Sequence, residues 1–235
     1  MNKRGASHVE MVFSFILFVA AIGFALYFFR PTDSSRLVET SFDYLFREIE
    51  KNASTEVFIF SAKINHSANP PSNIGFNVSG SNFEYKSSVF SENGVKLNST
   101  KYGDEIVFAD SPSGWNGIDF VSIVLSDEFE DELTPGDYNE SYYEISSSLK
   151  KDILSEKKFL SLNQNYNENY SMLKEEFNIP GRVNFGFSVS FSDGSKIEAK
   201  KEIPASLEVF VEKRRIEILR TNSGIEFGEL EVRVW

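Results

Sequence analysis

The sequence predicts an α+β protein in which an N-terminal transmembrane helix and an amphipathic stem helix precede an antiparallel, β-rich extracytoplasmic head. Three observations predict this class: a long apolar run near the N-terminus, a stripe of apolar residues at helical spacing after it, and alternation of apolar and polar residues in much of the remainder. The expected segments are a basic leader over residues 1–5, a transmembrane helix over 6–30, a stem helix over 31–52 and a β-rich domain over 53–235.

The apolar run over residues 9–29 predicts the transmembrane helix. Glu10 is its only charged residue, and a helix of this length at about 1.5 Å per residue spans about 30 Å, the thickness of a bilayer's hydrocarbon core. The basic pair Lys3-Arg4 precedes the run and favours a cytoplasmic N-terminus. A cleaved secretory signal peptide is the alternative, but the apolar run continues past its best cleavage site, Ala21-Ile22-Gly23. We therefore expect a single-pass protein of the cell membrane.

A more specific pattern lies just before the apolar run. Lys3-Arg4 is followed by Gly5 and then by the small residue Ala6, and Glu10 is the fifth residue after Gly5. This pattern resembles the class III signal peptide of type IV prepilin-like proteins, a family that includes archaeal pilins and pseudopilins. In that family a membrane-embedded prepilin-type peptidase cuts after the glycine, and the apolar helix stays in the mature protein.

The resemblance implies roles for three residues. Gly5 and Ala6 would flank the processing site, and Glu10 would act in assembly by pairing with the α-amino group of a neighbouring subunit. The implied partners are the lipid bilayer, the peptidase, and copies of the chain or other pilin-like subunits. Bacterial relatives usually carry phenylalanine where Ala6 stands, so the pattern favours an archaeal source. In the alternative interpretation, Glu10 reaches the lipid headgroups and complements the helix dipole.

The stem helix is expected to begin after Pro31, which ends the first helix because it lacks an N–H and clashes with the preceding turn. Thr32-Asp33-Ser34-Ser35 supplies N-cap side chains. Apolar residues then recur on one face, which we expect to pack on the domain's own sheet. The members of this stripe include Leu37, Phe42, Leu45, Phe46 and Ile49.

The head is expected to consist mainly of strands. Residues 56–64 and 119–125 are rich in β-branched and aromatic residues, which is typical of strands. Residues 73–101 contain glycines and the turn signal Asn93-Gly94, which predicts short hairpins. One helix is predicted over residues 161–177, where apolar residues return to helical spacing.

The C-terminal part carries the clearest β signal. Apolar residues alternate over residues 184–192, and Asp193-Gly194 follows as a hairpin turn. We predict a four-stranded antiparallel sheet with strands over residues 184–192, 197–203, 207–219 and 225–234.

Six Asn-x-Ser/Thr sequons follow the apolar run and are candidate glycosylation sites. They lie at Asn52, Asn65, Asn77, Asn98, Asn139 and Asn169. The alternative interpretation is that these residues are solvated loop asparagines.

The composition argues against catalysis and cofactor binding. The 235 residues carry a net charge of −11, which disfavours nucleic acid as a partner, and they include no cysteine and two histidines. The acidic run 127–132 lacks the spacing of a calcium loop and is expected to lie in a solvated loop over 126–136. His66 lies in a turn-like segment, and no phosphate loop or nucleophile motif is present. We therefore expect no catalytic residue, no metal and no cofactor.

These observations favour a membrane-anchored, pilin-like structural subunit of a type IV pilus-like surface filament or of a secretion pseudopilus. The alternative is a single-pass, signal-anchored surface protein that does not assemble and carries a binding or adhesion head. A third hypothesis is a membrane-tethered hydrolase whose site lies on loops without a recognisable motif.

Overall fold

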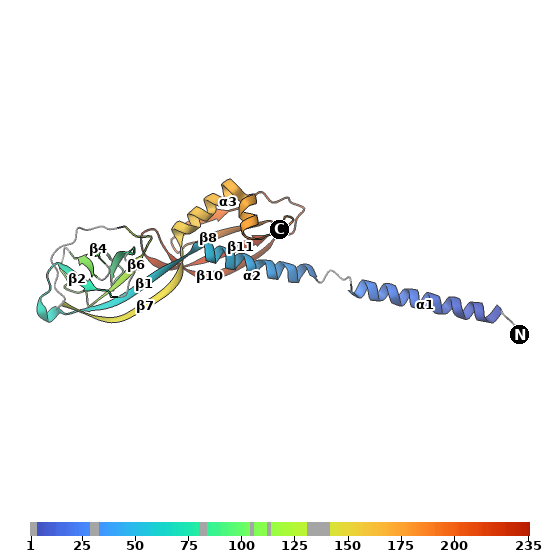
Figure 1. Ribbon diagram of the computed structural model, residues 1–235, viewed down its shortest axis with the longest axis horizontal. Helices are drawn as coiled ribbons and strands as arrows, with labels where there is room; N and C mark the ends of the chain where they lie inside the picture. The colour runs from blue at the N-terminus through green and yellow to red at the C-terminus, as the bar shows by residue number, and fades with distance from the viewer. Residues whose placement is uncertain (1–3, 29–32, 80–83, 104–105, 112–113, 131–141) are drawn as a thin grey trace. The chain divides into compact units, whose positions relative to one another are not determined.

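The computed structural model describes residues 4–28, 33–79, 84–103, 106–111, 114–130 and 142–235, with side chains in the two N-terminal helices described over 10–25 and from 40 onward. The chain divides into two compact units, Met1–Tyr44 and Leu45–Trp235. The described residues form one sheet of eleven strands and three α-helices, so the protein is mostly β (Figure 1). The predicted α+β class with a transmembrane helix is therefore wrong.

Unit 1 contains helix α1, Arg4–Phe28, and the start of α2, Asp33–Ala53. The predicted break at Pro31 lies outside the described residues. Within the part of the chain that the structure describes with side chains, no helix is both long and apolar enough to cross a membrane. This finding overturns the transmembrane helix predicted over 6–30 and the single-pass membrane localisation based on it.

Unit 2 is built on the sheet, whose strand order is β2-β5-β4-β3-β6-β1-β7-β10-β11-β8-β9. The helix between β7 and β8 is α3, Glu156–Glu176, and a short 3-10 helix, η1, covers His66–Ala68. The strands are β1 Ser54–Ile64, β2 Asn73–Asn77, β3 Lys86–Ser91, β4 Lys96–Tyr102, β5 Ile106–Asp110, β6 Phe120–Ser126, β7 Tyr143–Ser155, β8 Phe185–Ser190, β9 Lys196–Ala199, β10 Phe210–Leu219 and β11 Ile225–Val234.

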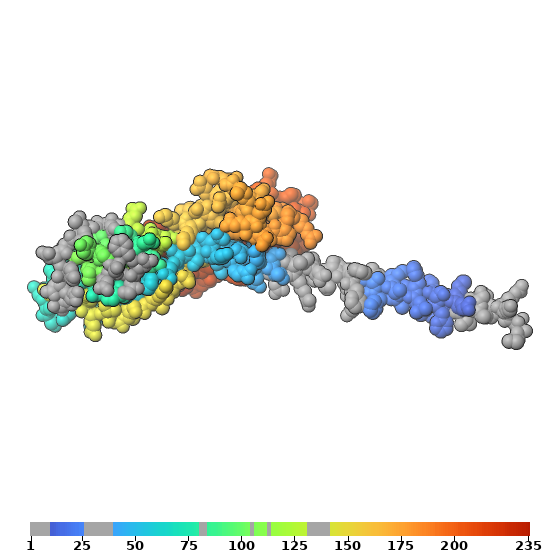
Figure 2. Space-filling view, in the orientation of Figure 1, coloured from blue at the N-terminus to red at the C-terminus, as the bar shows by residue number. Residues whose placement is uncertain are grey.

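A short junction joins the two halves of the sheet. β7 and β10 pair in parallel at only two positions, Leu154 with Ile218 and Ser155 with Leu219, whereas the other strand pairs are antiparallel. In unit 2, β2, β4 and β6 lie at one end, and β8, β11 and α3 lie at the other (Figure 1). Figure 2 shows β7, in yellow, at the surface of unit 2. The two halves of the sheet are therefore hydrogen-bonded to each other only at these two positions of β7 and β10.

Each half has its own core. In the half that contains β1, Trp115 is part of a large cluster of buried apolar residues. Its Nε1 donates to the carbonyl oxygen of Pro71 at 2.7 Å. In the half that contains β8, aromatic residues of α3 pack on the sheet, with Tyr166 against Phe185 and Phe187. A smaller cluster lies at the junction and brings residues of both halves together: Val57, Val124, Phe129, Ile153 and Leu219. This cluster supplies the apolar contact that holds the halves to each other.

Several predicted elements are confirmed in unit 2. The strands predicted over 56–64, 119–125 and 225–234 correspond to β1, β6 and β11, and the C-terminal strands pair antiparallel in the order β10-β11-β8-β9. Helix α3 begins earlier than predicted because Ser155 caps it, its Oγ accepting from the Lys158 N–H at 3.1 Å. β9 is shorter than the predicted strand over 197–203, and β7 was not predicted from the sequence.

Candidate functional site: the exposed apolar helix

The surface of α1 is the most apolar exposed region of the described chain. Every residue over 10–25 is exposed, and most of them are large and apolar. Met11 is 71% exposed, and Phe15 and Leu17 are each 67% exposed. Soluble proteins rarely leave a continuous apolar surface of this size uncovered, so α1 is a candidate contact site for another molecule.

The sequence-predicted processing and assembly residues lie at the start of this helix. Gly5 and Ala6 fall in the first turn of α1, which begins at Arg4. Glu10 is exposed and is the only acidic residue over 10–25. Ala6 and Glu10 are four residues apart, which places them on the same side of the helix.

The candidate glycosylation sites are spread over unit 2 and α2. Asn139 lies outside the described residues, and the other five asparagines do not form a cluster in the sequence or on one element. Asn52, Asn65, Asn98 and Asn169 are exposed, whereas Asn77 is half-buried and its Oδ1 accepts from the Ser79 hydroxyl at 2.6 Å. Asn169 has non-helical backbone angles, φ −134° and ψ 41°, at a kink in α3.

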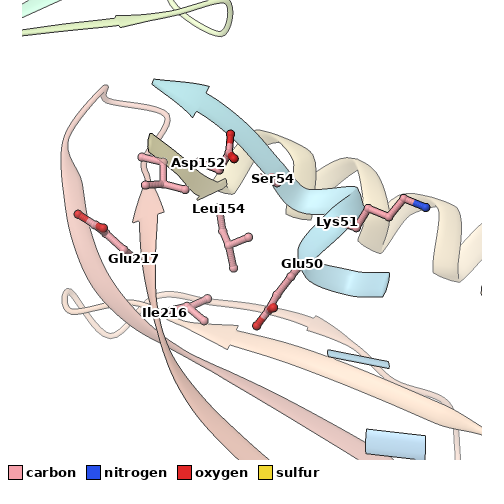
Figure 3. Close-up of a pocket in the computed structure, with 8 residues that line it drawn as sticks. Glu50, Lys51, Ser54, Asp152, Leu154, Ile216 and Glu217 are labelled. Atoms are coloured by element: carbon pink, nitrogen blue, oxygen red, sulfur yellow. The ribbon is translucent and has the colours of Figure 1, made fainter. Parts of the chain in front are cut away.

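A groove of about 360 Å³ lies where β7 and β10 diverge (Figure 3). Its lining includes the buried side chains Leu154 and Ile216 and the carboxylates of Glu50, Asp152 and Glu217. In Figure 3, Glu50 extends toward Ile216, whereas Lys51 points away from the groove. Across the described residues, no group of three or more acidic, histidine or cysteine side chains is arranged to hold a metal ion. The groove therefore offers an apolar floor with an acidic rim, and no set of metal ligands.

An ion-pair network around Arg220 is the strongest electrostatic feature of unit 2. The Arg220 guanidinium donates to Glu156 at 2.9 Å, to Asp193 at 3.1 Å and to Glu226, and it lies over the ring of Phe191. The Ser195 hydroxyl and N–H, together with Arg220, lower the pKa of Asp193 to about 2. These contacts join the start of α3, the β8–β9 turn and β11, which is a structural role.

A second polar cluster links β1 to its neighbours. The Tyr85 hydroxyl donates to Glu56 at 2.5 Å, and Lys150 pairs with the same carboxylate at 2.6 Å. Burial and the bond to Glu56 raise the pKa of Tyr85, and the bonds from Lys150 and Tyr85 lower the pKa of Glu56. Every member is satisfied by a partner within the protein, so the cluster holds the fold and presents no reactive group.

The two histidines and the acidic run 127–132 complete the set of residues considered from the sequence. His66 lies in η1, where its Nε2 is 3.1 Å from Asp119 Oδ1, and His8 has no described side chain. In the acidic run, Glu128 accepts from the Ser155 hydroxyl beside the start of α3. The Arg220 network and the groove were not predicted from the sequence, because their residues come from segments far apart in the chain.

Comparisons of the chain with protein-family models, with curated proteins and with solved structures found no match.

Proposed function

We propose that this protein is a pilin-like structural subunit of a surface filament or pseudopilus, and that it assembles through α1 with copies of itself or with other pilin-like subunits. The observation that carries the proposal is the exposed apolar surface of α1 over residues 10–25. Such a surface is stable in water only when another surface covers it.

The distribution of apolar residues around α1 supports contact with several neighbours. The apolar side chains lie on all sides of the helix, whereas those of α2 form a stripe on one side. A helix that is apolar all round is suited to the centre of a bundle. Contacts between different faces of identical helices are heterologous, and when the rotation does not close they build a filament.

The energetics also favour more than one neighbour. Burying four large side chains such as Phe13, Phe15, Leu17 and Phe18 contributes about 6–12 kcal/mol, at about 1.5–3 kcal/mol each. Association costs about 4–15 kcal/mol in lost freedom of motion. A single helix pair is therefore marginal, whereas a helix surrounded by neighbours gains a surplus.

Cleavage between Gly5 and Ala6 completes the proposal. It would create an α-amino group one helical turn before Glu10. Inside a bundle the Glu10 carboxylate would lie among apolar side chains, where an unpaired charge is costly. A terminal amino group on a neighbouring subunit gives Glu10 a partner and sets the register of the two helices.

Site-specific cross-linking tests this function, because the chain has no cysteine of its own. We expect Leu17→Cys to form covalent dimers with a flexible bis-maleimide cross-linker, whose spacer reaches residue 17 of an adjacent helix even when the two helices contact each other through different faces. Val95→Cys is the matched control, since Val95 is 60% exposed and lies in unit 2. Phe15→Asp should abolish the Leu17→Cys product, because it places a charge in the contact.

The opposite result would refute assembly through α1. If Leu17→Cys cross-links no more than Val95→Cys, or if Phe15→Asp leaves the yield unchanged, the helix is not a subunit contact. Intact mass of the protein from its native source tests processing separately. A mature chain that begins at Ala6 supports the proposal, and a chain that retains Gly5 contradicts it.

A further inference from the structure

Most of β10 is an open sheet edge. One edge of the strand pairs with β11 along Phe210–Leu219, whereas the other pairs with β7 only at Ile218 and Leu219. Within the described residues, no strand neighbours this second edge over residues 210–217. The backbone N–H and C=O groups of an open edge form a template that can pair with another chain.

Charges protect only part of this edge. Proteins usually block an open edge with charges, proline or a bulge, and the middle of β10 carries Lys213-Arg214-Arg215. Just before these cations, Val209 and Val211 are 37% and 52% exposed, and with Phe210 they form a segment of high strand propensity. The exposed, unprotected part of the edge is thus also its most apolar part.

The charges on either side of Val211 select a second copy of β10 as the partner. In an antiparallel pair with a two-fold axis at Val211, Glu208 lies opposite Arg214 and Phe210 lies opposite Glu212. Moving the axis by one residue brings like charges together: an axis at Phe210 places Glu208 opposite Glu212, and an axis at Glu212 places Glu212 opposite itself. Opposite charges stabilise directly facing positions, and like charges destabilise them.

Arg214 is already held in place for this contact. Its guanidinium lies 4.0 Å from the centre of the Phe46 ring and 3.0 Å from the Glu212 carboxylate. Because these contacts fix the side chain within each copy, less freedom is lost when Glu208 of a second copy approaches it.

We propose that residues 208–214 are a self-association surface, at which two copies join their β10 edges as an antiparallel pair about a two-fold axis at Val211. The pair would make the two sheets continuous. A two-fold contact of this kind closes at a dimer. It belongs to unit 2 and does not rest on the proposed function, which concerns an open-ended contact through α1.

A disulfide at the two-fold axis tests the register directly. Facing residues of an antiparallel pair have Cα atoms about 4.5–5.5 Å apart, within the range that a disulfide bridges. Val211→Cys should therefore form a covalent dimer in the full-length chain. Phe227→Cys is the matched control, because Phe227 is 55% exposed on the neighbouring strand β11 and lies away from the open edge. Both variants are made together with Phe15→Asp, so that contact through α1 does not contribute.

The outcomes separate this proposal from assembly through α1. A Val211→Cys dimer that forms in the presence of Phe15→Asp supports the β10 contact, whatever Leu17→Cys shows. Equal yields from Val211→Cys and Phe227→Cys would overturn it. Glu208→Arg provides a second readout, because it places a new guanidinium of one copy opposite Arg214 of the other. It should shift the sedimentation of the Phe15→Asp chain from dimer to monomer, and an unchanged dimer would exclude the Val211 register.

Discussion

Replacing Arg220 with methionine should destabilise unit 2 strongly, because this side chain joins three segments that are distant in the sequence. Arg220 is 14% exposed, and its partner Glu156 is 12% exposed, so little water can replace the lost hydrogen bond. Hydrogen bonds to charged groups contribute about 1.5–3 kcal/mol, and the contact with Phe191 adds about 0.5–1 kcal/mol. The pair with Asp193 adds little, because that carboxylate is 55% exposed. The expected loss is about 3 kcal/mol in the free energy of unfolding.

Urea unfolding of the full-length chain, followed by far-UV circular dichroism, measures this loss. For a unit of this size, a loss of about 3 kcal/mol lowers the melting temperature by about 6–12 °C. Arg215→Met is the matched control, because Arg215 lies on β10, the strand that ends just before Arg220, is exposed and stacks on Phe227 at 4.1 Å. It should cost less than about 1 kcal/mol. Equal midpoints for Arg220→Met and Arg215→Met would refute the reasoning that the Arg220 network holds the segments together.

Three further predictions concern unit 2. The pKa of Asp193 is lowered from 3.8 to about 2, so its contribution to stability is present above pH 3.8 and is lost as the pH falls toward 2. Asp193→Asn should reduce this loss of stability in acid-unfolding curves. An unchanged pH dependence would contradict the role of Ser195 and Arg220. Gly228→Ala should lower the free energy of unfolding in urea by about 1–3 kcal/mol, because its new Cβ would lie 2.6 Å from Ile218 Cδ1; wild-type stability would contradict the packing described. Tyr166→Phe should cost about 1 kcal/mol by the same measurement, because its hydroxyl donates to a buried backbone carbonyl at 2.6 Å, and no change would mean that water replaces this bond.

Strands whose large apolar residues alternate with small or polar residues could be predicted from the sequence. In β8, Phe185, Phe187 and Val189 alternate with small residues, and this pattern identifies the strand without further information. β11 runs over the predicted residues 225–234, and its buried residues Leu230, Val232 and Val234 alternate with charged residues. The sequence therefore predicted strands in which every second residue is apolar and buried.

Strand β7 could not be predicted from the pattern of its own side chains. Its middle residues Ser146-Ser147-Ser148 and Lys150 are exposed, so no apolar period marks them as a strand. The strand forms because its backbone pairs with β1 along residues 143–154, and that pairing leaves no trace in local composition. Exposed strands of this kind depend on their neighbours more than on their own side chains.

The candidate contact helix could be found from the sequence, whereas the ion-pair network of unit 2 could not. The apolar surface of α1 and the position of Glu10 could be read directly from consecutive residues, although the membrane span inferred from them was wrong. The Arg220 network could not be predicted, because Glu156, Asp193 and Glu226 come together only through the fold. Sequence patterns thus located the candidate contact helix but gave no sign of the interactions that hold unit 2 together.

Electron microscopy of the purified chain that begins at Ala6, as cleavage after Gly5 would leave it, tests the central claim most directly. If α1 is the assembly element, the wild-type chain should form filaments of constant width, and Phe15→Asp should give only dispersed particles. Dispersed particles from the wild-type chain, or filaments that persist in Phe15→Asp, would contradict assembly through α1.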